Sequence, residues 1–248
     1  VSAEIAEVKV NYSGHCYLEL VEKGEGDGVP KAQARAVIWR SQYARIAAYF
    51  EAETGQRLAA GMRILAKATV NYHELYGFSL QLLDVDPAYT LGDMERQRQQ
   101  TIARLQAEGV WEMNRQQAMP AVVQCIAVVS SNRAAGYQDF CNELAKSPYR
   151  FCLTLFDAVV QGAAAEDSIV DALSRIAAAG EAFDAVVMIR GGGSSSDLNC
   201  FNAYRLCNHV AQFPLPVVTG IGHDKDTSVA DLVAHTALKT PTAVAAWL

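Results

Sequence analysis

The chain has 248 residues, of which 51% are hydrophobic and 19% are charged, so it can build a sizeable core and wholesale disorder is excluded. Its 27 acidic residues outnumber its 21 basic residues and give a formal net charge of -6. This balance argues against a protein that coats nucleic acid through bulk charge alone, but it leaves room for a local basic cleft.

The first third of the chain alternates short apolar runs with turns. Strands are predicted at 3–10, 15–21, 33–40, 61–70 and 77–85, with a short helix at 43–53. Five strands with one helix between the third and the fourth match the OB-fold, a barrel whose open face often binds single-stranded nucleic acid. We therefore assign residues 1–90 to an OB-fold domain that binds single-stranded nucleic acid.

Four side chains of this domain could bind nucleic acid by stacking or by charge. They are Tyr17, Arg35, Trp39 and Tyr72. The alternative for the aromatic ones is that they fill the barrel.

Beyond Asp86 and Pro87 the sequence changes period. A polar helix is predicted at 91–108, followed by apolar strands at 125–130, 151–159, 184–189 and 216–221 and by helices at 134–145, 163–179, 198–211 and 227–234. Strands that are apolar throughout and alternate with helices indicate a mostly parallel, four-stranded sheet covered on both faces. Residues 91–248 are therefore assigned to an α/β domain, whose functional residues should follow the carboxyl ends of its strands.

The loop after the third of these strands has the composition of a phosphate site. Arg190 stands before Gly191, Gly192, Gly193 and Ser194. Glycines let the backbone approach a ligand, amides at the start of a helix attract anions, and arginine adds a fork of donors. The loop lacks both the P-loop pattern and GxGxxG, so neither a nucleoside triphosphate nor a dinucleotide site is supported. A flexible turn is the alternative.

The loop after the fourth strand carries His223 with Asp224 and Asp226. An imidazole beside carboxylates is suited to general acid or base catalysis, although a lone histidine can also be structural. Asp224 and Asp226 could also hold Mg²⁺ together with Asp139.

The remaining composition favours a cytoplasmic protein. No CxxC pair occurs among the six cysteines, and we expect reduced, buried thiols. No signal peptide and no membrane span are visible. Because the sequence begins with Val1 and ends at Leu248 without a closing motif, we expect a fragment of a longer protein.

Several patterns together resemble the exodeoxyribonuclease VII large subunit. The run 190–194 is followed by Asp197 with Leu198 and by Phe201 with Asn202. Further matches are Ser13-Gly14-His15 with Tyr17, Glu108-Gly109, Ala134-Ala135 with Asp139, Val160-Gln161-Gly162 with Ala165, Gly222-His223 with Asp226, Asp231, and Thr240-Pro241-Thr242-Ala243. Their order and spacing hold along nearly the whole chain.

The resemblance implies an OB-fold for single-stranded DNA followed by a nuclease domain that degrades single strands from both ends into short oligonucleotides. It assigns catalysis to Asp139, Arg190, His223 and Asp226. In that family a long helical region follows the nuclease domain and gathers several copies of a small subunit. This chain stops where that region should begin, so the part that binds the small subunit is expected to be missing.

The chain departs from the family pattern at four positions. Ser196, Tyr204 and Asp224 stand where the family usually has glutamate, and His235 replaces a usual aspartate. The four principal candidates for catalysis are present.

The hypothesis that follows is hydrolysis of phosphodiester bonds. Arg190 and the amides of 191–194 would stabilise charge at the pentacovalent phosphorus, and His223 would transfer a proton. Asp226 would orient the histidine, and Asp139 would activate water. The resemblance implies activity without a divalent metal, and the alternative is Mg²⁺ held by the three aspartates. Two rival functions are a single-stranded-DNA-binding scaffold without nuclease activity and an enzyme acting on a small phosphorylated molecule.

Overall fold

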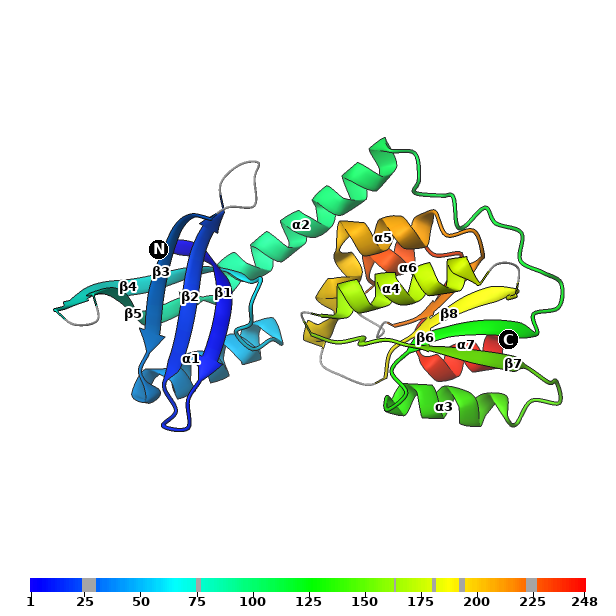
Figure 1. Ribbon diagram of the computed structural model, residues 1–248, viewed down its shortest axis with the longest axis horizontal. Helices are drawn as coiled ribbons and strands as arrows, with labels where there is room; N and C mark the ends of the chain where they lie inside the picture. The colour runs from blue at the N-terminus through cyan, green and yellow to red at the C-terminus, as the bar shows by residue number, and fades with distance from the viewer. Residues whose placement is uncertain (24–29, 75–76, 163, 180–181, 192–194, 222–226) are drawn as a thin grey trace. The chain divides into compact units, whose positions relative to one another are not determined.

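The computed structural model describes residues 1–23, 30–74, 77–162, 164–179, 182–191, 195–221 and 227–248. It contains two compact units, Val1–Arg96 and Gln97–Leu248 (Figure 1).

The first unit is a closed barrel of five strands in the order β1-β2-β3-β5-β4. The strands are β1 Ser2–Val10, β2 Cys16–Lys23, β3 Pro30–Ile38, β4 Arg63–His73 and β5 Gly77–Asp86, and helix α1 covers Arg40–Thr54. All neighbours pair antiparallel except β3 and β5, whose parallel pairing completes the barrel. This arrangement confirms the predicted OB-fold.

The barrel forms because apolar residues alternate along its strands. Cys16, Leu18 and Leu20 of β2 point inward and are buried, while the residues between them face outward. From α1, Ile46 and Phe50 pack into the same core. The third strand ends earlier than predicted, because Arg40 already belongs to α1.

Helix α2, Pro87–Ala107, begins directly after β5 and contains the division between the two units. The helix begins four residues before the predicted start at 91, because proline does not only break strands. Proline is equally suited to the first position of a helix, where its missing N–H has no intrahelical partner.

The second unit holds a parallel sheet in the order β10-β9-β8-β6-β7. Its strands are β6 Cys125–Ser130, β7 Cys152–Asp157, β8 Ala185–Ile189, β9 Val217–Gly220 and β10 Thr236–Leu238. Its helices are α3 Ala135–Leu144, α4 Ala165–Ala178, the 3-10 helix η1 Ser195–Asn202, α5 Tyr204–Ala211, α6 Val229–Val233 and α7 Pro241–Trp247.

The predicted α/β fold is confirmed, with three main differences in detail. A further helix, α7, covers Pro241–Trp247 and was not predicted. The sheet has a fifth strand, β10, whose three residues are too few to show a period. The helix predicted at 198–211 is divided into η1 and α5, because Ala203 between them has an extended backbone (φ -65°, ψ 131°).

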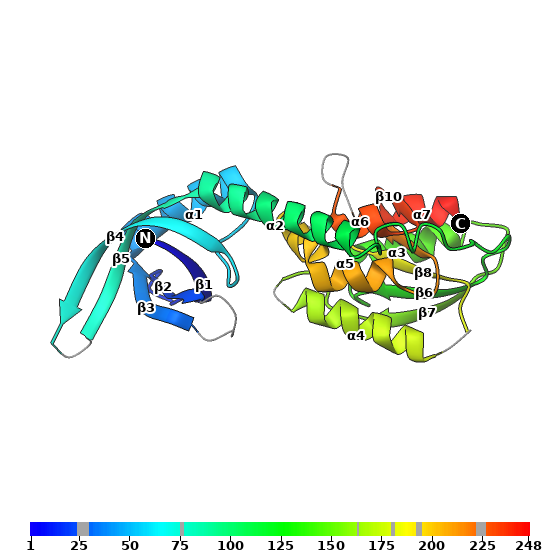
Figure 2. The same ribbon diagram turned by 90° about the horizontal axis from the view of Figure 1, so that it is seen from above.

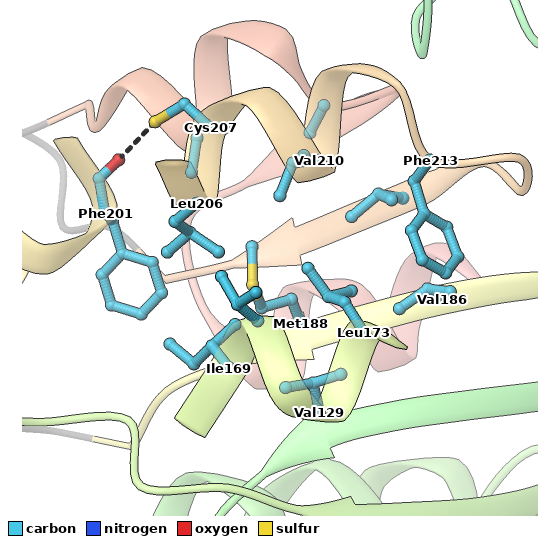
Figure 3. Packing of buried hydrophobic residues seen from close by; sticks show 14 of the residues in the cluster. Val129, Ile169, Leu173, Val186, Met188, Phe201, Leu206, Cys207, Val210 and Phe213 are labelled. Atoms are coloured by element: carbon cyan, nitrogen blue, oxygen red, sulfur yellow. Dashed lines mark hydrogen bonds between the residues drawn. The ribbon is translucent and has the colours of Figure 1, made fainter. Parts of the chain in front are cut away.

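Both faces of this sheet are covered by helices (Figure 2). On one face Val186 and Met188 of β8 pack with α4 and α5, and the thiol of Cys207 donates to the carbonyl oxygen of Phe201 at 3.3 Å (Figure 3). On the other face Val187 packs with residues of α3 and α7. The alternation of the two sets along β8 explains why the whole strand is buried and reads as one apolar run.

The segment between α2 and β6 is held in place by Asn114, whose side chain is fully buried. Its Nδ2 donates to the carbonyl oxygens of Phe213 (3.1 Å) and Leu215 (2.9 Å). Its Oδ1 accepts from the backbone N–H groups of Val217 (2.9 Å) and His235 (3.0 Å). Asn114 therefore joins this segment to the residues at or just before the start of β9 and β10.

Two further expectations concern the burial of the cysteines and the absence of a membrane span. The described cysteines lie outside any disulfide. Cys16 and Cys207 are buried as predicted, but three others are half-buried, and Cys152 is exposed because β7 lies at the edge of the sheet. None of the helices in the described ranges is long and apolar enough to cross a membrane.

Candidate functional site

The strand order locates the candidate site within the second unit. The chain leaves β6 toward β7 on one side and leaves β8 toward β9 on the other, so the direction of winding reverses between β6 and β8. In sheets of this kind, ligands bind outside the carboxyl ends of the strands at such a switch point. Asp139 lies in the helix after β6, and Arg190 directly follows β8. The fold therefore brings these two predicted catalytic residues to the same edge of the sheet.

Two glycines allow the loops after β6 and β8 to touch. A Cβ atom added to Gly136 would lie only 2.5 Å from Gly191 Cα and 3.0 Å from the carbonyl oxygen of Arg190. A Cβ atom added to Gly191 would lie 2.8 Å from the backbone nitrogen of Gly136. Neither glycine has a positive φ, so the close approach of the two backbones requires glycine here. The first turn of α3 thus packs directly on the Arg190–Gly191 backbone.

The contact between Gly136 and Gly191 brings the helix that carries Asp139 to this edge of the sheet. Asp139 is exposed and stands three residues after Gly136 in α3, so both lie on one side of the helix. Side chains in a helix lean toward its N-terminus, which here is the end that contacts Gly191. Asp139 therefore lies in the helix whose first turn contacts the edge of the sheet that carries Arg190.

Arg190 lies directly after the last residue of β8. Its side chain is almost fully buried, with 5% exposure. The next residue, Gly191, contacts the first turn of α3. The loop that begins at Arg190 and the helix that carries Asp139 thus meet at the Gly191 backbone.

The remaining residues predicted for this site lie outside the described residues. They are Gly192, Gly193, Ser194, His223, Asp224 and Asp226. The strand that precedes His223 is described: β9 ends at Gly220, which pairs with Ile189 at the end of β8, so the chain leaves β9 at the same edge of the sheet as Arg190. Of the three aspartates proposed for Mg²⁺ only Asp139 is described. Within the described ranges no group of three His, Cys, Asp or Glu residues could hold a metal ion.

Two residues at this edge were not predicted. Ser130, the last residue of β6, is fully buried, and its Oγ has no hydrogen-bond partner among the described residues. Asp157, at the end of β7, accepts a hydrogen bond from the backbone N–H of Asn132 at 2.8 Å and so orders the loop that leads into α3. Their position after apolar strands was visible in the sequence, but only the pairing of Ser130 with Asp157 shows that they are neighbours.

In the barrel, two of the four predicted nucleic-acid contacts lie together. Tyr17 pairs with Val37, and Glu19 pairs with Arg35, so Tyr17 and Arg35 are diagonal neighbours on the outer face of β2 and β3. Tyr17 is 45% exposed and Arg35 is exposed as well. Lys9 pairs with Tyr17 from β1 and adds a second positive charge to the same face.

Trp39 lies at the junction of β3 and α1. Its ring meets His15 edge-on, with the centroids 5.0 Å apart, and is 40% exposed. The backbone N–H of Arg40 donates to Nδ1 of the same histidine at 3.1 Å. Trp39 thus joins the turn between β1 and β2 to the end of β3 and keeps part of its ring accessible.

Tyr72 lies on a different strand pair, in a ribbon where β4 and β5 continue past the rest of the barrel (Figures 1 and 2). It pairs with Phe78, and Val70 lies on the same face two residues earlier. All three side chains are at least half exposed. Phe78 and Val70 were not predicted as contacts, because an apolar residue in a strand is expected to face the core.

Each of the two units matches a known protein family. Residues 110–248 match the family described as "Exonuclease VII, large subunit", and residues 1–86 match an "OB-fold nucleic acid binding domain". The exodeoxyribonuclease 7 large subunit of Deinococcus radiodurans is 38% identical over 100% of this chain and 61% of its own length. The corresponding proteins of a Nostoc species and of Xanthomonas euvesicatoria are 37% and 32% identical over 86% and 99% of this chain. The chain covers 50% and 52% of these two relatives, so it spans little more than half of the proteins it matches.

Proposed function

The chain belongs to the exonuclease VII large-subunit family, and on this premise we propose that it hydrolyses phosphodiester bonds of single-stranded DNA. It does so from both ends of the strand and releases short oligonucleotides. The observation that carries the proposal is the backbone contact between Gly136 and Gly191. This contact joins the loop that leads to Asp139 with the loop that begins at Arg190, at the switch point of the sheet.

Each residue of the site has a role in this reaction. The Arg190 guanidinium and the amide of Gly191 stabilise the negative charge that develops on the phosphoryl oxygens. Asp139 directs the attacking water. His223, oriented by Asp226, transfers the proton between this water and the oxygen of the bond that breaks. The burial of Arg190 supports its role, because a charged donor acts more strongly where water is excluded.

The barrel would hold the strand during cleavage. Lys9 and Arg35 offer charge to the phosphates, and Tyr17 between them offers a ring to a base. The exposed ribbon with Tyr72 and Phe78 would hold further bases. We therefore propose residues 1–90 as the part that binds single-stranded DNA and residues 91–248 as the part that cleaves it.

Partners, cofactor and compartment follow from the family and are likewise proposals. The complete protein would bind a small subunit through a region beyond this chain, and the reaction would take place in the cytoplasm. Arg190 and His223 would allow hydrolysis without a metal ion. If Mg²⁺ is used, Asp139, Asp224 and Asp226 would hold it and it would lower the pKa of a bound water.

Cleavage of end-labelled oligonucleotides tests the proposal. We expect the chain, with and without the small subunit, to degrade single strands and to leave double strands intact. Activity that survives excess chelator supports the metal-free reaction, and its complete loss supports Mg²⁺. Tight binding of single strands without any cleavage would instead support the scaffold.

Arg190→Lys tests the central residue. Lysine keeps the charge but loses the planar fork of donors, so the cleavage rate should fall about 100-fold or more. The matched control is Arg205→Lys, since Arg205 is an exposed arginine paired with Asp167 in the same unit, and it should leave the rate unchanged. An Arg190→Lys protein that cleaves at the original rate would remove Arg190 from the site.

Tyr72→Ala and Phe78→Ala test the ribbon. Loss of stacking on one base costs about 1–3 kcal/mol, which corresponds to roughly 5- to 150-fold weaker binding of a labelled single strand. Tyr149→Ala, which removes an aromatic ring with 72% exposure from the other unit, is the control and should not change the affinity. Equal affinity of all three variants would show that the ribbon does not contact the strand.

A further inference from the structure

A buried carboxylate joins the strand that precedes residues 222–226 to the start of the helix that follows them. Asp231 in α6 is 5% exposed. Its Oδ1 accepts from the Thr219 hydroxyl at 2.6 Å, and its Oδ2 accepts from the backbone N–H of Ser228 at 3.0 Å and from the Ser228 hydroxyl at 2.7 Å. Thr219 lies in β9, before these residues, and Ser228 lies after them. One side chain therefore binds both.

A second polar side chain connects the same helix to the loop that follows Arg190. Asn202 is the last residue of η1, and its Oδ1 accepts from the backbone N–H of Val229 at 2.9 Å. Val229 is the first residue of α6. The start of α6 is thus bound on one side to β9, through Asp231, and on the other side to η1, through Asn202.

Helix capping by itself does not explain this arrangement. A capping box needs only the reciprocal bonds between Ser228 and Asp231, which are both present. The bond from Thr219 crosses to the sheet and adds nothing to the cap.

We propose that Asp231 and Asn202 are positioning residues for DNA cleavage, because they bind α6 to β9 and to η1, the elements that border the segment with His223 and the loop after Arg190. The inference rests on the proposed function. Asp231 is too deeply buried to contact a polynucleotide, so it acts through the residues whose backbone it holds. A displacement of about 1 Å in a catalytic group can lower the rate about 100-fold. Loss of these hydrogen bonds should therefore lower the rate of cleavage more than the affinity for DNA.

The test compares two aspartates of the same unit. Asp231→Asn keeps the shape of the side chain but replaces one acceptor oxygen with a donor. The control is Asp184→Asn, because Asp184 also accepts two backbone N–H bonds, from Gln124 (2.8 Å) and Cys125 (2.7 Å), but at the amino-terminal edge of the sheet. Both variants should lower Tm. Only Asp231→Asn should also lower kcat, by about 10- to 100-fold with KM unchanged within about twofold.

Asn202 offers a test by rescue. Asn202→Ala removes the acceptor for the N–H of Val229 and should lower kcat, whereas Asn202→Asp keeps an acceptor oxygen and should restore most of it. If kcat per folded molecule is unchanged in Asp231→Asn and in Asn202→Ala, both residues are merely structural and the proposal is overturned.

Hydrogen–deuterium exchange separates this inference from the proposed function. Faster exchange over 215–232 in Asp231→Asn than in Asp184→Asn supports the anchoring, and equal exchange overturns it. Failure of the unsubstituted chain to cleave single strands would refute the nuclease function, and the role in catalysis with it, while the exchange result would still decide whether Asp231 holds the segment.

Discussion

Asn114→Ala is the substitution that we expect to destabilise the second unit most clearly without touching the candidate site. The Asn114 amide makes four hydrogen bonds to backbone groups of three other parts of the unit. Alanine leaves two N–H groups and two carbonyl groups in the interior without this partner. The carbonyl oxygen of Phe213 keeps a second donor, Gln117 Nε2, at a long 3.5 Å.

The expected loss of stability follows from these four bonds. With about 1 kcal/mol for each buried hydrogen bond, the free energy of unfolding should fall by about 4 kcal/mol. A unit of this size loses about 2–4 °C of Tm for each kcal/mol, so its Tm should fall by roughly 8–16 °C. Water that enters the space left by the amide would move the result toward the lower value.

Thermal and urea unfolding of the variant measure this loss. The control is Asn208→Ala, because the Asn208 side chain accepts only one side-chain hydrogen bond, from Gln212 on the helix surface, and its loss should cost about 0.5 kcal/mol or less. If Asn114→Ala loses no more stability than Asn208→Ala, the four bonds do not hold the segment and our reasoning is refuted.

Two further predictions concern other parts of the chain. Gly136→Ala places a Cβ on the backbone of Gly191, so it should lower both Tm and cleavage, whereas Gly92→Ala meets nothing within 4 Å and should raise the stability of α2 by about 0.5–1 kcal/mol; thermal unfolding of both variants checks this pair. Burial raises the pKa of the Cys207 thiol. At pH 8 a thiol reagent should therefore label exposed Cys152 promptly and Cys207 only as the protein unfolds, and prompt labelling of Cys207 in a mass spectrum would contradict its burial.

The local hydrophobic pattern of the sequence was sufficient to predict most of the helices and strands. Strand β6 has the predicted bounds, because an apolar run that ends at polar residues defines a buried strand within a few positions. The pattern failed where local rules compete. Trp39 continues an apolar run but is the N-cap of α1, whose first residue is Arg40, and the three residues of β10 are too few to show any period.

At the candidate site, too, the sequence indicated the residue types, whereas only the structure shows how the residues are arranged. The residue types at Arg190 and Gly191, directly after an apolar strand, led to the prediction of a phosphate site, and the family resemblance added Asp139; both remain predictions. The positions of these residues relative to one another could not be predicted, because they depend on which strands are neighbours. Only the order of the sheet puts β6 beside β8 and so brings Gly136 against Gly191.

The sequence by itself therefore determined the two folds, the loops that carry polar and glycine residues, and the family resemblance, because hydrophobic period and motif spacing are local properties of the chain. The tertiary structure alone decided the neighbours: the contact of Gly136 with Gly191, the bonds of Asn114, and the double anchoring by Asp231. Each of these joins segments far apart in the sequence or on different elements. Such contacts arise from the packing of whole strands and helices, which no period along the chain encodes.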